Sequence, residues 1–319
     1  MSHISLATIE KAAQVIDPVF LNSPQFELDA LNDVLGFQLV CKLETLNPVR
    51  SFKGRGTSWL VAQLQKRNQS GQVVCASAGN FGQGMAYACR QAAIDLTVFA
   101  ATTANPLKLE RMRALGAELR LEGDDFDAAK EAARAYAKTS NLTFVEDARD
   151  VETAEGAGTI GLELSRYPEP LDAVLVPLGN GALINGIGAC LKAKSPSTRI
   201  LGVVATGAPA MDLSWRANEV ITTETADTIA DGIGVRLPIA EALDAMRYTV
   251  DDIVQVTDTQ ILEAMRLAHK TVGVVLEPAG AVGLAAAQVY KERFRGKLAA
   301  TVMCGSNLTP EQMTNWLFQ

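Results

Sequence analysis

Short apolar runs rich in β-branched residues alternate with helical patterns along most of this 319-residue chain. This alternation is typical of parallel β-sheets whose faces are covered by helices. The apolar runs predict strands at residues 37–42, 72–76, 96–100, 118–121, 143–145, 173–177, 200–205, 253–256 and 298–304. The helical patterns predict helices at residues 60–67, 83–92, 106–115, 126–138, 184–193, 259–271 and 281–293. The sequence therefore predicts an α/β protein, in which ligands bind beyond the carboxyl ends of the strands.

The length and charge of the chain limit what it binds. A chain of 319 residues exceeds the size at which single hydrophobic cores usually stop growing, so we expect two lobes. Small-molecule sites favour the crevice between lobes. The net charge of −7 argues against nucleic acid or an anionic membrane surface as a partner. No uncharged apolar run reaches about 18 residues, so no membrane span is predicted.

The cysteines and histidines narrow the chemistry further. The five cysteines form no C-x-x-C pair and no leader segment is evident, which favours buried thiols in a reducing, cytoplasmic compartment. The two histidines, His3 and His269, are too few for a multi-histidine metal site or a convincing Ser-His-Asp triad. An enzyme with this composition needs a different base, and lysine is the natural candidate.

A basic segment, Arg-Ser-Phe-Lys-Gly-Arg-Gly at residues 50–56, precedes one of the predicted helices. A lysine at a helix start is electrostatically unfavourable, because the N-terminal end of a helix favours anions. Arg50 and Arg55 add positive charge beside Lys53, and an amine whose charged form is disfavoured becomes a nucleophile. The alternative interpretation is a solvated basic turn.

Two turns rich in glycine follow predicted strands and open helices. The first, Ser-Ala-Gly-Asn-Phe-Gly-Gln-Gly at residues 77–84, combines free backbone N–H groups with small side chains that permit close approach of an anion. An ordinary helix cap is the alternative there. The second, Gly-Asn-Gly-Ala-Leu at residues 179–183, matches neither the dinucleotide fingerprint nor the P-loop. It therefore favours a single phosphate over a nucleotide. Residues 276–281 and 304–307, each taken alone, are explained by an ordinary helix start or turn.

Taken together and in this order, these segments resemble the fold-type II pyridoxal-phosphate enzymes, in particular the serine/threonine dehydratase branch. The resemblance runs from about Phe20 to the C-terminus and includes residues 42–44 and 228–232. It implies a tryptophan synthase beta-like α/β fold with two open, twisted, mostly parallel sheets and pyridoxal 5'-phosphate in the cleft between domains. It also implies a large domain of residues 1–71 and 150–319, a small domain of residues 72–149, and a homodimer.

The resemblance implies a role for each residue of these segments. Lys53 would carry the cofactor as a Schiff base and, with Ser77, would be catalytic. Phe52 would contact the cofactor ring, Asn80 its phenolic oxygen and Cys304 its pyridine nitrogen. The phosphate would be held by Gly179, Asn180, Gly181, Ala182 and Leu183. The substrate carboxylate would be held by Ser77, Ala78, Gly79 and Asn80.

The activity implied is elimination of water from a small 3-hydroxy amino acid of the serine or threonine type, giving a 2-oxo acid and ammonia. A β-replacement enzyme or synthase is the alternative on the same fold. Arg50 allows an acidic substrate such as 3-hydroxyaspartate, although a side chain that faces solvent or pairs with a structural carboxylate is the favoured explanation. A non-catalytic protein that binds a phosphate ligand is the alternative outside enzymes. Ala78 disfavours racemisation, because related racemases carry a hydroxyl there. No metal is expected, because residues 203–206 lack the carboxylates of metal-binding relatives.

Overall fold

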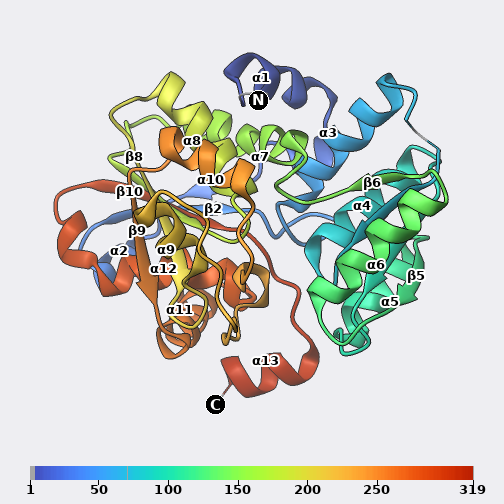
Figure 1. Cartoon of the computed structure of the whole chain (residues 1–319). Helices are drawn as coiled ribbons and strands as arrows, with labels where there is room; N and C mark the ends of the chain where they lie inside the picture. The colour runs from blue at the N-terminus through green and yellow to red at the C-terminus, as the bar shows by residue number, and fades with distance from the viewer. Residues whose placement is uncertain (1–3, 70, 319) are drawn as a thin grey trace.

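The computed structural model describes residues 4–69 and 71–318, so His3 lies outside the described residues. Two sheets form the framework (Figure 1). The larger sheet has the strand order β1-β2-β10-β7-β8-β9, with bounds Gln25–Phe26, Gln38–Leu43, Leu298–Met303, Ala173–Pro177, Arg199–Ala205 and Asp252–Val256. The smaller sheet has the order β5-β4-β3-β6, with bounds Glu118–Leu121, Leu96–Ala100, Val73–Ala76 and Thr143–Val145. Every predicted strand is present with ends shifted by no more than one residue, and the α/β fold class is confirmed.

Nearly all neighbouring strands are parallel. The exception is β1, which the sequence did not reveal and which pairs antiparallel with β2 at the sheet edge. Parallel strands require crossover connections, and these place helices on both faces of a sheet. One face of the larger sheet is covered by α2 (Asp29–Leu35), α11 (Asp258–Thr271) and α12 (Pro278–Val289), as Figure 1 shows. The other face is covered by α7 (Val151–Leu164), α8 (Ala182–Lys194), α9 (Ala210–Ala217) and α10 (Ala240–Thr249).

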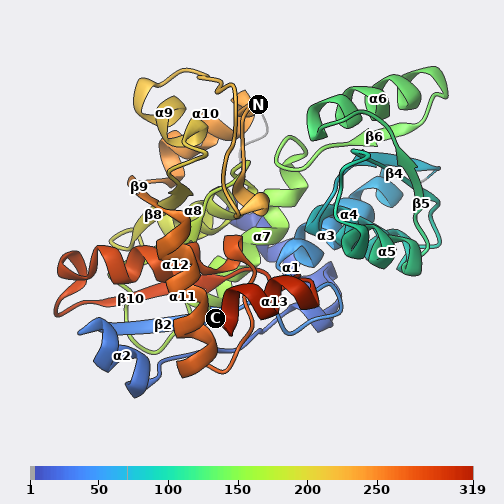
Figure 2. The same ribbon diagram turned by 90° about the horizontal axis from the view of Figure 1, so that it is seen from below.

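The smaller sheet has its own apolar core. One face contacts α3 (Lys53–Lys66), α4 (Asn80–Gln91) and α5 (Pro106–Ala114). The opposite face contacts α6 (Phe126–Thr139), and Figure 2 shows α6 and α5 on opposite sides of the strands. We propose that residues 72–149 form a small domain, and that residues 1–71 and 150–319 form a large one. Two further helices, α1 (Leu6–Val15) and α13 (Pro310–Leu317), lie near the chain ends. No helix within the described ranges is long and apolar enough to cross a bilayer.

The start of α3 differs from the sequence-based prediction. The structure begins this helix at Lys53, which agrees with a lysine at a helix start, whereas the helical pattern itself extends only over residues 60–67. The helical propensity of residues 53–59 is low because glycine, present at Gly54 and Gly56, is a poor helix former. Both glycines serve packing. A Cβ on Gly54 would lie 2.2 Å from the Phe20 ring, and one on Gly56 would lie 2.6 Å from the carbonyl oxygen of Thr153 in α7.

We expect Gly56→Ala to destabilise the protein by about 1–3 kcal/mol, the usual range for overpacking a close contact. The added methyl would meet backbone atoms of α7, which cannot rotate away as a side chain can. Urea titration measures the effect. Gly71→Ala is the matched control, because its Cβ would have no neighbour within 4 Å. Equal unfolding free energies for the two variants would show that α3 and α7 separate without strain.

Candidate active site

A cavity of about 580 Å³ lies where the carboxyl ends of β3, β6, β7 and β10 meet. Parallel strands bring their carboxyl ends to one edge, so the residues that follow them share this space. All the site residues predicted from the sequence line the cavity, namely Phe52, Lys53, Ser77, Ala78, Gly79, Asn80, Gly179, Asn180, Gly181, Ala182, Leu183 and Cys304. Segments far apart in the chain are therefore brought together as predicted, while their individual roles stay predictions.

Lys53 projects into the cavity from the first turn of α3. Its ammonium nitrogen lies 4.6 Å from the centroid of the Phe52 ring and donates to Oδ2 of Asp147 at 2.6 Å. Phe52 is itself fixed, because its backbone N–H donates to the carbonyl of Cys304 at 3.0 Å. The end of β10 thereby holds the residue before the lysine in place.

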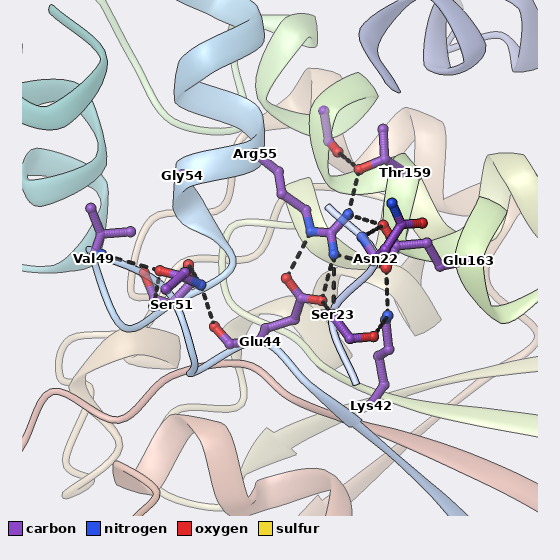
Figure 3. Close-up of polar contacts among 12 residues, drawn as sticks. Asn22, Ser23, Lys42, Glu44, Val49, Ser51, Gly54, Arg55, Thr159 and Glu163 are labelled. Carbon is purple, nitrogen blue, oxygen red and sulfur yellow. Dashed lines mark hydrogen bonds and ion pairs between the residues drawn. The ribbon is translucent and has the colours of Figure 1, made fainter. Parts of the chain in front are cut away.

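Arg55 anchors the same turn from behind, and it does not add charge at Lys53 as the sequence suggested. Its guanidinium is fully buried and binds both Glu44 and Glu163 through two hydrogen bonds each, of 2.6–3.0 Å (Figure 3). Glu163 also accepts from Lys42 at 2.5 Å. Two cations and two carboxylates therefore neutralise one another behind α3. The prediction for Arg55 missed these partners, because Glu163 lies 108 residues away in the sequence and Glu44 follows a different element, β2.

The N-terminus of α4 forms one wall of the cavity. Its N-cap residue, Gly79, has no side chain to cap the first turn. Ser77 instead accepts from the backbone N–H groups of Gly79 and Gly82, at 3.2 and 2.9 Å, so its hydroxyl hydrogen stays available to a ligand. Uncapped N–H groups with a hydroxyl donor beside them suit a carboxylate.

Asn80 is held at both ends of its amide. Its nitrogen donates to Glu277 at 2.6 Å, and its oxygen accepts from the side chain of Asn307 at 2.8 Å. One amide hydrogen is left to face the cavity. Glu277 also accepts from the backbone N–H of Asn307 at 3.0 Å. Burial raises the pKa of the Glu277 carboxyl, while Lys108 and the bonds from Asn80 and Asn307 oppose the rise.

Glu277 was not identified as a site residue from the sequence. The segment 276–281 passed there as a helix start, and Glu277 is indeed the N-cap of α12, with Pro278 as the first helical residue. The apolar neighbours of Glu277 in the sequence could have indicated its burial. A carboxylate enclosed between Leu276 and Pro278 is expected to be buried only with partners.

A second uncapped helix N-terminus, that of α8, faces the cavity across from α4. Its N-cap, Gly181, has a φ of 100°, a conformation that favours glycine, and no described side chain caps the helix. A Cβ on Gly179 would lie 2.9 Å from the carbonyl oxygen of Gly232, so the loop also needs glycine there. Free N–H groups at a helix start with no side chain in the way fit a phosphate.

Cys304 closes the cavity at the end of β10. Its thiol is buried and contacts the carbonyl oxygen of Ala279 at 3.6 Å. Burial raises the pKa of this thiol, and the charge of Glu277 acts in the same direction. The side chain is therefore a neutral, weak hydrogen-bonding group at neutral pH.

The turn after β6 was not predicted as part of the site. It brings Asp147 to Lys53, and Oδ1 of Asp147 is buried with no hydrogen-bond partner among the described residues. Ala148, which follows, has a φ of 65°, in the left-handed region that is strained for alanine. Asp150 accepts from the backbone N–H of Glu146 at 2.6 Å, and Thr153 accepts from that of Ala148 at 3.1 Å. These bonds hold the strained turn in place.

We expect Asp150→Asn to remove a pH dependence of stability. Burial raises the pKa of Asp150 from 3.8 to about 6, although the Glu146 N–H opposes the rise. Between these values the folded protein holds a proton that the unfolded chain releases, so stability falls as the pH rises from about 4 to about 6. The amide keeps an acceptor for Glu146 without the charge. Stability at pH 7 should rise by up to about 3 kcal/mol, since one pKa unit is worth about 1.4 kcal/mol.

Urea titrations between pH 4 and pH 7 measure this change. Asp124→Asn, which removes an exposed carboxylate, serves as the control. A steep fall in stability that persists in Asp150→Asn would mean that other buried carboxyls, such as Glu277, cause it.

Arg50 lies outside the cavity. Its side chain is exposed, and it is not among the residues that line the cavity. The solvent-facing interpretation of Arg50 is confirmed, and the hypothesis of an acidic substrate loses the residue on which it depended.

Known proteins resemble this chain in sequence and in fold. The family described as "Pyridoxal-phosphate dependent enzyme" matches residues 16–305. L-threonine ammonia-lyase of Thermotoga maritima is 34% identical over 305 residues, which cover 96% of this chain and 76% of that protein. Maize serine racemase superposes with a TM-score of 0.93 at 26% identity, covering 98% of this chain and 97% of that one. The processed form of threonine deaminase isoform 2 from Solanum lycopersicum superposes with a TM-score of 0.90 at 28% identity, covering 98% of this chain and 88% of that one. The chain belongs to the family of pyridoxal-phosphate dependent enzymes.

Proposed function

We propose that the protein is a pyridoxal-phosphate dependent ammonia-lyase that removes water from a small 3-hydroxy amino acid of the serine or threonine type. One observation carries this proposal. The amine of Lys53 shares a single cavity with two helix N-termini whose N-cap residues are glycines, one suited to a carboxylate and one suited to a phosphate. The names of the threonine ammonia-lyase and threonine deaminase relatives support the substrate class.

The residues of the cavity fit the cofactor. Gly179, Asn180, Gly181, Ala182 and Leu183 would bind its phosphate at the start of α8. Phe52 would contact the ring, and Asn80 would donate its remaining amide N–H to the phenolic oxygen. When bound, pyridoxal phosphate supplies an electron sink for the charge that remains when an amino acid loses its α-proton.

The protein would contribute positioning and proton transfer. Ser77 and the backbone N–H groups of Ala78 and Asn80 would hold the substrate carboxylate, with Gly79 leaving room for it between them. The Lys53 amine would then remove the α-proton, because it lies against the Phe52 ring and close enough to Cys304 for its charge to act on the thiol. A neutral thiol at Cys304, unlike a carboxylate, would not hold a proton on a ring nitrogen. This favours prompt elimination of the β-hydroxyl over transamination.

The reaction is tested with purified protein supplied with pyridoxal phosphate. We expect a visible absorbance band from the bound cofactor, and release of a 2-oxo acid and ammonia in equal amounts when L-serine or L-threonine is added. A band with no such products, but with a condensed product when thiols or other nucleophiles are present, would replace elimination by β-replacement. No band at saturating cofactor would reject the enzyme and favour a non-catalytic phosphate-binding protein.

We propose further that the protein is a cytoplasmic homodimer. All five cysteines are buried and unpaired, which suits a reducing compartment. Two-fold homo-oligomers are the commonest assemblies of soluble proteins. Sedimentation equilibrium measures the oligomeric state directly.

A further inference from the structure

We propose that Asp147 is a positioning residue for Lys53, which holds the lysine nitrogen at the place where it meets the substrate. This inference rests on the proposed function. Its starting point is the contact of 2.6 Å between Nζ of Lys53 and Oδ2 of Asp147. Both side chains are more than four-fifths buried, at 18% and 17% exposed, so water screens the pair weakly.

The second step concerns the spare capacity of the carboxylate. Oδ1 of Asp147 is buried and has no hydrogen-bond partner in the part of the chain that the structure describes. A buried carboxylate oxygen without a hydrogen-bond partner lowers the stability of the fold, so its presence indicates a functional role. Lys53 is the only cation whose ion pair with Asp147 is seen among the described residues. The carboxylate therefore interacts with Lys53 through Oδ2, and its Oδ1 stays available to a ligand bound at Lys53.

The third step concerns how firmly the pair is held. Asp147 sits in the turn whose left-handed residue, Ala148, is kept in place by Thr153, and whose start is tied to Asp150. The following helix α7 presses against the first turns of α3, because a Cβ on Gly156 would lie 2.5 Å from the Cα of Gly56. Lys53 on α3 and the turn that leads from Asp147 into α7 are thus fixed by two helices in direct backbone contact. Backbone strain beside a reactive group, secured by its neighbours, is a feature of functional sites.

The other charges around the pair are already engaged. Glu146, the neighbour of Asp147, is matched by Lys130, Arg134 and Arg149, at 3.1–3.5 Å. Glu277 is bound by Asn80 and Asn307, and Cys304 is neutral. Across the cavity, Lys108 pairs with Asp231, and Arg236 pairs with Asp127. Asp147 is therefore the carboxylate in direct contact with the Lys53 nitrogen.

This placement gives Asp147 two tasks in the proposed reaction. With pyridoxal phosphate bound at Lys53, the carboxylate would stabilise a positive charge on the lysine nitrogen. It would also hold the Lys53 side chain near the substrate α-carbon and stabilise the ammonium formed once the lysine has taken up the α-proton. The proton moves from the α-carbon to Nζ, and Asp147 itself neither gains nor loses one.

The experiment follows the visible band of the holoenzyme from pH 5 to pH 10 in the wild type, Asp147→Asn and Asp147→Glu. Without the carboxylate, the spectral transition should move at least about one unit to lower pH, the usual size of such a charge effect. If the wild type has no transition in this range, one should appear in Asp147→Asn. Asp147→Glu restores the charge and should lie nearer the wild type. The kcat of Asp147→Asn should fall about 10- to 100-fold, with a KM within about threefold.

Glu146→Gln is the matched control, because it removes a carboxylate from the same turn that does not contact Lys53. Asp147→Ser replaces Asp147→Asn if the latter does not fold. Identical spectral transitions in the Asp147 and Glu146 variants would overturn the role of Asp147 while leaving the proposed function intact. Failure of the wild type to form the band and a 2-oxo acid would reject the proposed function itself.

Discussion

Replacing Lys53 by alanine is expected to abolish the visible band of the bound cofactor and to lower kcat by at least about 10³-fold, since positioned proton transfer alone contributes roughly 10²–10⁴-fold. The band depends on a covalent bond to an amine, and Lys53 is the lysine that lies against Phe52 and the end of β10. The loss of the α-proton acceptor adds to the loss of covalent attachment. Absorbance spectra and a 2-oxo acid assay measure the two effects separately.

Two other cavity lysines serve as controls for this experiment. Lys108 and Lys130 line the same cavity, but their nitrogens pair with Asp231 and with Asp127 and Glu146. Lys130→Ala should therefore retain the band and most of the turnover. A band that persists in Lys53→Ala and disappears in Lys130→Ala would move the attachment point to the other side of the cavity. The proposed role of Lys53 would then be abandoned.

The strands could be predicted from the sequence because their signal is local. A run such as Ala173–Pro177 is short, apolar and flanked by turns, and it forms a buried strand wherever the chain places it. The helix α7 has no comparable pattern. All its residues from Glu152 to Leu164 are buried, so its apolar and small side chains show no amphipathic periodicity. The same helix supplies Glu163 and the contact with Gly56, and both stayed invisible for that reason.

The site residues likewise fall into those that a local sequence pattern predicts and those that depend on distant contacts. The sequence predicts the two segments that bind through backbone N–H groups, residues 77–80 and 179–183. Both are glycine-rich turns between a strand and a helix, where backbone N–H groups are free to bind an anion. Asp147 and Glu277 were missed, because each acts through a partner far away in the chain, 94 and 197 residues from Lys53 and Asn80 respectively. A lone carboxylate after a strand is common. Only the fold shows which of them faces an amine.

Replacing Arg55 by methionine is expected to destabilise the protein by about 3–5 kcal/mol, the usual effect of removing one partner from a buried ion pair. Methionine fills much of the same volume but leaves Glu44 and Glu163 buried without the guanidinium that now binds both (Figure 3). Lys42 still reaches Glu163, so the larger loss falls on Glu44, whose other close side-chain donor is Ser23. Urea titration at pH 7 measures the change.

The pH dependence distinguishes an unpaired charge from a simple loss of packing. Although burial alone would raise the pKa of Glu163, the hydrogen bonds and charges of Arg55 and Lys42 hold it below its ordinary value. In the wild type, this carboxylate contributes stability that is present above the unfolded pKa and is lost as the pH falls. Without Arg55 the contribution shrinks, so the difference between the two proteins should be largest at pH 7 and smaller near pH 4.

Arg295→Met provides the matched control for Arg55. Arg295 pairs with Glu292 at 2.8 Å, but both side chains are mostly exposed, so this pair should contribute no more than about 1 kcal/mol. A loss of the same size in both variants would contradict the view that the cluster of Arg55, Lys42, Glu44 and Glu163 stabilises the start of α3. A large loss confined to Arg55→Met, together with a weaker cofactor band in the folded variant, would connect that cluster to Lys53. The buried charges would then serve the site as well as the fold, because the first turn of α3 carries both Lys53 and Arg55.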